Sequence, residues 1–169
     1  RRVEVEDHDR LIDEAKVLID DPQRTTAEAP REGQTLLIEM GWDDQNAVLF
    51  EGEVTEVEVI EHACAPRQLR LRALDLSFRI RQRPIAPRNH TGTLSAILRE
   101  IVSRAPATGI AVGTITVDPD TEYTDRNPLR QTTQNDWDFV QAQARRRNSR
   151  AFVEFNANQS KFYFLPIAA

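Results

Sequence analysis

The segment from Leu49 to Val59 reads LFEGEVTEVEV, and the first half of the chain is organised around it. Its β-branched residues recur at every second position, which is the spacing of a strand that buries one of its two faces. Gly52 stands where such a strand bends or bulges, because glycine has no side chain to pack. The pattern predicts the central strand of a β-barrel.

The strand that follows, Gln68 to Leu76, is predicted to pair with this segment as a hairpin. One register segregates the side chains completely, with apolar pairs on one face and opposite charges on the other. Its pairs are Val57 with Leu71, Val59 with Leu69, Glu56 with Arg72, and Glu58 with Arg70. A slip of one residue would destroy both sets, so the sequence specifies the register.

Three further strands are predicted before this hairpin, at Val3–Glu6, Glu14–Asp20 and Leu36–Met40, with a loop over residues 22–33 and a turn over residues 41–44. Beyond the hairpin, Arg79, Arg81 and Arg83 continue the period-two alternation. We therefore expect an arginine-rich strand face that forms salt bridges with acidic neighbours or with another subunit.

The second half begins after a proline-rich stretch, residues 84–90, which predicts a domain boundary. Thr93 and Asn135 each stand as an N-cap before a helical pattern of apolar residues. A strand over Ile110–Val117 and a hairpin of Ala151–Phe155 with Lys161–Leu165 complete this half. The predicted fold class is α+β: an antiparallel, tube-type β-barrel over residues 1–84 and a smaller α+β domain over 85–169, with two helices packed on strands.

Composition bounds the function without naming it. The 169 residues are 40% hydrophobic and 29% charged, which predicts a folded chain. The net charge of −5 argues against a protein that binds nucleic acid over its whole surface. The longest apolar run, residues 162–169, contains Pro166 and is too short to span a bilayer, so we expect a soluble protein. The first residue is Arg1 and the chain stops after a strand-like run, so we expect a fragment of a longer protein.

No metal, cofactor or catalytic site is predicted. Cys64 is the single cysteine, and no Cys/His spacing suits zinc. The acidic stretch 118–129 lacks the glycine and the final carboxylate of a calcium loop. The histidines at 8, 62 and 90 fall in separate predicted loops without recognisable partners.

Two motifs give the chain a family resemblance. The first is Gly41-Trp42-Asp43 followed by the central strand, with Phe50 and Gly52 at its key positions. The second is Gln134-Asn135-Asp136-Trp137-Asp138-Phe139-Val140, followed by Ala144, Arg145 and a hairpin. Together they resemble the phage tail baseplate hub family, which includes late control D-type proteins and the hub portion of VgrG-like proteins of contractile injection systems. The family serine is Asn135 here, and the family glycine after the helix is replaced by Asn148-Ser149, which keeps a residue that tolerates the left-handed conformation.

The resemblance implies a structural protein and no enzyme. Hub proteins of this family are homotrimers with two barrels per subunit that link a tail tube to a central spike. The implied partners are other copies of the chain, tube proteins and spike proteins, with no nucleic-acid sequence recognition and no membrane insertion. The implied location is a phage tail or injection particle assembled in the bacterial cytoplasm, and Arg79, Arg81 and Arg83 are candidates for a subunit contact.

Two alternatives remain open. A carboxylate-dependent hydrolase is possible because 27 acidic residues allow some pair to converge in space. A small β-barrel that binds a ligand is the other alternative, and it requires an apolar cavity inside the barrel. A filled barrel without a perturbed carboxylate cluster would favour the hub.

Overall fold

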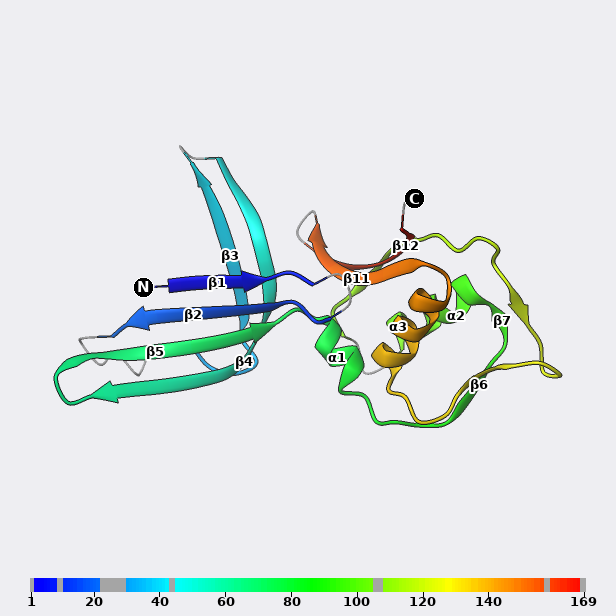
Figure 1. Cartoon of the computed structure of the whole chain (residues 1–169), viewed down its shortest axis with the longest axis horizontal. Helices are drawn as coiled ribbons and strands as arrows, with labels where there is room; N and C mark the ends of the chain where they lie inside the picture. The colour runs from blue at the N-terminus through cyan, green and yellow to red at the C-terminus, as the bar shows by residue number, and fades with distance from the viewer. Residues whose placement is uncertain are drawn as a thin grey trace. The chain divides into compact units, whose positions relative to one another are not determined.

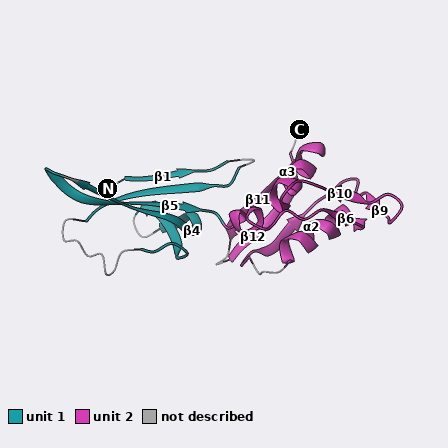
Figure 2. Cartoon of the chain, turned by 90° about the horizontal axis from the view of Figure 1, so that it is seen from below, with its two compact units in different colours: residues 1–75 teal, residues 76–169 magenta. Residues whose placement is uncertain are grey.

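The computed structural model describes residues 2–8, 11–21, 30–42, 45–104, 108–156 and 159–167, and only the backbone of His62. The chain divides into two compact units, Arg1–Asp75 (unit 1) and Leu76–Ala169 (unit 2) (Figure 2). The predicted loop over 22–33 and the predicted turn over 41–44 lie partly outside the described residues.

Unit 1 is one antiparallel sheet. Its strands are β1 (Arg2–Glu6), β2 (Glu14–Asp20), β3 (Thr35–Trp42), β4 (Gln45–His62) and β5 (Ala65–Leu74). They lie in the order β1-β2-β5-β4-β3, and the sheet curls into half of a barrel (Figure 1). Among the described residues β1 and β3 are the two edges, so the sheet is open.

The central strand β4 pairs with two different strands along its length. Its first part, up to Glu53, pairs with β3, and the rest pairs with β5. The pairing shifts register between Val54 and Glu56, and a Cβ on Gly52 would overlap the carbonyl oxygen of Leu74 and the ring of Phe50. The irregularities of β4 therefore lie on either side of Gly52, and Gly52 itself lets another strand approach the backbone closely.

The predicted hairpin register is also confirmed. In the structure Val57 pairs with Leu71, Val59 with Leu69, Glu56 with Arg72, and Glu58 with Arg70. Leu69 and Leu71 are buried, and so is a cluster formed by Ala15, Ile38, Phe50 and Ala73. Val59 is largely exposed, so the apolar face of this hairpin is covered only in part.

The predicted continuation of the strand through Arg83 is wrong. β5 ends at Leu74, and Ser77–Arg81 forms a short helix, α1, in unit 2. Phe78 and Ile80 alternate with arginines as in a strand, yet both are buried in the helix. A period-two pattern over so few residues does not distinguish a strand from a single helical turn. The short helix α1 packs against the longer helix α3.

Unit 2 contains two longer helices and several short sheets. The helices are α2 (Leu94–Ser103) and α3 (Asp136–Arg146). The strands are β6 (Arg88–His90), β7 (Gly92–Thr93), β8 (Ala111–Ile115), β9 (Glu122–Tyr123), β10 (Leu129–Gln131), β11 (Ser149–Asn156) and β12 (Gln159–Pro166). β6 pairs with β10, β7 pairs with β9, and β11-β12-β8 forms a three-stranded sheet.

Both predicted helix caps are confirmed. The Thr93 hydroxyl accepts a hydrogen bond from the Ala96 N–H at 3.3 Å, and the Asn135 side chain accepts one from the Asp138 N–H at 2.8 Å. The predicted β11–β12 hairpin is present, and Asn148 adopts the expected positive φ of 49°. Helix α2 packs on β8 and α3 on β11, which places the predicted helices on strands. The predicted domain boundary after residue 84 lies within unit 2. The division of the chain into domains 1–84 and 85–169 stays a prediction.

Candidate assembly surfaces

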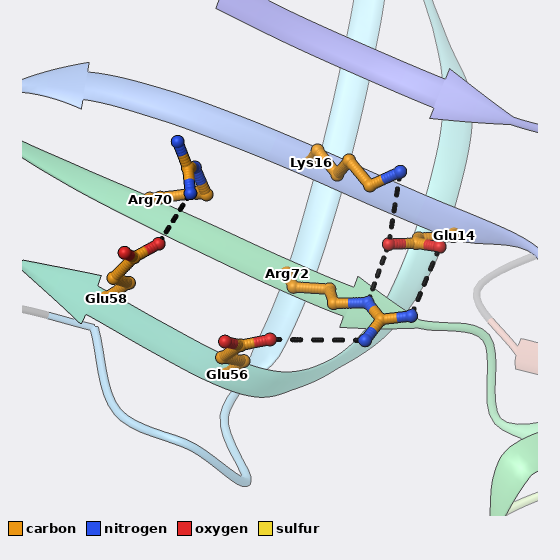
Figure 3. Close-up of a pocket in the computed structure, with 6 residues that line it drawn as sticks. All are labelled: Glu14, Lys16, Glu56, Glu58, Arg70 and Arg72. Atoms are coloured by element: carbon orange, nitrogen blue, oxygen red, sulfur yellow. Dashed lines mark hydrogen bonds and ion pairs between the residues drawn. The ribbon is translucent and has the colours of Figure 1, made fainter.

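Charged side chains gather on one face of the unit 1 sheet (Figure 3). Lys16 on β2, Arg72 on β5 and Glu56 on β4 lie in one row across the strands. With Glu14, Glu58 and Arg70 they line a depression of about 270 Å³ (Figure 3).

Close ion pairs hold this charged face together. Arg72 Nε lies 2.6 Å from Glu14 Oε1, and Arg70 Nη1 lies 2.6 Å from Glu58 Oε2. The predicted Arg72–Glu56 pair is present but longer, at 4.0 Å. Burial tends to raise the pKa of Glu14, but the interactions with Arg72 and Lys16 together outweigh that effect and lower the pKa below its usual value. Three carboxylates face three cations here, so the depression has no excess charge with which to hold an ion.

Asp13, also in unit 1, has a raised pKa. Burial, reinforced by the nearby Asp75 and Asp7, raises its pKa to about 7. Its Oδ1 accepts a hydrogen bond from the His8 N–H at 2.8 Å, and its own N–H donates to Asp75 Oδ2 at 2.7 Å. The carboxylate thus has a structural role, because it links the two ends of the β1–β2 connection, although a raised pKa is also what a hydrolase would need.

The first sequence motif lies on the β3–β4 hairpin. Phe50 and Gly52 are buried, whereas the Trp42 side chain is 89% exposed at the end of β3. A Cβ on Gly41 would overlap the backbone of Gln45 and Asn46, so Gly41 permits the two strands to approach closely. The motif therefore combines two glycines, Gly41 and Gly52, that let neighbouring strands approach closely, with the exposed side chain of Trp42.

The second motif lies in the core of unit 2. Trp137 and Phe139 are buried, and Asp136 is buried with both carboxylate oxygens occupied. Asp136 accepts hydrogen bonds from Arg83 at 3.1 Å, from Arg104 at 3.1 and 3.2 Å, and from the Gln131 amide at 3.0 Å. The motif aspartate is thus the centre of a buried polar network.

This network changes the interpretation of the three arginines. Arg83 is buried and also donates to the carbonyl oxygens of Ile101 and Arg104, at 2.6 and 2.8 Å. Arg79 is partly buried and donates to the carbonyl oxygen of Thr108 at 2.9 Å. Arg81 is exposed. The three do not share a strand face, and Arg81 is the member with an exposed side chain for the predicted subunit contact.

Sequence reasoning missed the partner of His90. This residue lies on β6 rather than in a loop, is buried, and its Nε2 lies 2.9 Å from the Gln131 side-chain oxygen. Its ring also packs on Phe139, with ring centroids 5.2 Å apart. No local sequence pattern predicts the contact between His90 and Gln131, because the two residues are 41 positions apart. His8 lies in unit 1, where its Nε2 is 3.6 Å from Glu6 Oε2.

Within the described residues, no three or more His, Cys, Asp or Glu side chains are grouped so that they could hold a metal ion. The helices in that part of the chain are all too short or too polar to cross a membrane.

Comparisons with known proteins give a fold likeness. No family model matches the sequence, and no curated protein does. Among solved structures, the chain is similar to the E. coli c3393 protein, described as a component of the type VI secretion system with structural similarity to the T4 bacteriophage tail proteins gp27 and gp5. The TM-score is 0.64 at 13% sequence identity, over 96% of this chain and 49% of that one. The likeness shows the fold, and this chain spans about half the length of the protein it resembles.

Proposed function

We propose that this chain is part of a structural baseplate hub of a phage tail or related contractile injection system. The observation that carries the proposal is the fold likeness to the type VI secretion component, which extends over 96% of the chain. The two motifs also support it, because the residues that resemble hub proteins include Gly52, where Leu74 of β5 closely approaches β4, and Asp136, the centre of the buried network.

The hub linkage itself is the finer part of the proposal. We propose a homotrimer whose subunits each contribute two tube-type barrels, with the half-barrel of unit 1 forming part of one of them. Such a ring would join a six-fold tail tube to a three-fold spike. Among the described residues the sheet has two edges, β1 and β3, and this supports the view because a sheet edge is suited to pairing with another chain. The particle would be assembled in the bacterial cytoplasm.

We propose no catalytic role. The charged depression supports a structural reading because its carboxylates are paired with Arg70, Arg72 and Lys16. One observation favours the hydrolase alternative, namely the Asp13 carboxyl with its pKa raised to about 7. The bonds of Asp13 to the β1–β2 connection favour a local structural role instead.

The test is copurification of the full-length protein with tube and spike proteins of the same particle, combined with light scattering. The hub proposal expects a trimer that binds both. A full-length protein that stays monomeric at high concentration and binds neither would contradict it. Arg81→Glu tests the remaining arginine contact, with circular dichroism as the folding control. A trimer weakened without loss of structure is the expected result.

A further inference from the structure

We draw no further inference here: the strongest candidate, the outer end of the β3–β4 hairpin, where the side chains of Met40 and Trp42 are 55% and 89% exposed, carries none because nothing in the structure shows what covers it.

Discussion

Asp13 is the residue whose protonation most clearly ties stability to pH. Its pKa is about 7 in the folded chain and about 4 in an unfolded one, so folding favours the protonated form. Stability is therefore greatest below pH 4 as far as this group is concerned, and it falls as pH rises towards 7. The carboxyl is only about half buried, so solvent screening limits the effect to about 1 kcal/mol.

Asp13→Asn is expected to raise the free energy of unfolding by about 1 kcal/mol at pH 8 and to change it little at pH 4. The amide keeps an oxygen that accepts the His8 N–H, so the gain comes from removing the charge. Urea unfolding at both pH values measures it. Asp13→Ala, which removes that acceptor too, serves as the comparison. An Asn variant that loses stability at pH 8 would show that the ionised carboxylate is favourable there.

Asp136 is the residue on which unit 2 most depends for charge balance. Asp136→Asn leaves the buried Arg83 guanidinium without its counter-charge, and breaking a buried pair in this way costs about 3–5 kcal/mol. Asp138→Asn is the matched control, since Asp138 lies in the same first turn and loses the same interaction with the helix dipole, worth about 0.3–1 kcal/mol. Thermal unfolding of both variants gives the difference. Equal losses would mean that the network contributes little.

At the scale of elements, β4 depends on the absence of a side chain at Gly52. Alanine is ordinarily better than glycine inside a strand by about 0.5–1 kcal/mol. Here a Cβ would overlap the Leu74 carbonyl and the Phe50 ring, so Gly52→Ala is expected to destabilise the chain by about 1–3 kcal/mol. Denaturant unfolding gives the sign directly. Thr35→Ala, on the exposed side of the paired strand, provides the baseline, and a stabilised Gly52→Ala variant would refute the close approach.

At the scale of the whole molecule, the two units are expected to fold separately. A fragment of residues 76–169 contains a core of its own, including Ile101, Phe139 and Phe162, and it is expected to unfold cooperatively. A fragment that starts at residue 85 lacks α1 and Arg83, so Asp136 loses a partner. We expect the shorter fragment to be less stable by about 3 kcal/mol or more. Calorimetry on both decides where the folding boundary lies, and equal stability would favour residue 84.

The sequence alone determined the features that depend on neighbours along the chain. Alternating residues set the register of β4 with β5, because a slip would turn every apolar side chain to the wrong face. Thr93 and Asn135 set the starts of α2 and α3, because a cap bonds to N–H groups only a few residues away. The motif residues Asp136, Trp137 and Phe139 were identified in advance, but their shared place in the core of unit 2 was not.

Only the tertiary structure decided the features that join distant residues. Helix α1 forms where alternation predicted a strand, because burial of Phe78 and Ile80 outweighs the local pattern. The Arg83–Asp136 pair joins positions 53 residues apart. Burial raises the pKa of Asp13, and the charge of Asp75, 62 residues away, raises it further. The exposure of Trp42 could not be predicted from the sequence either, because it depends on which other parts of the fold pack over the side chain. Local sequence specifies strands and caps, whereas burial and charge pairing belong to the assembled fold.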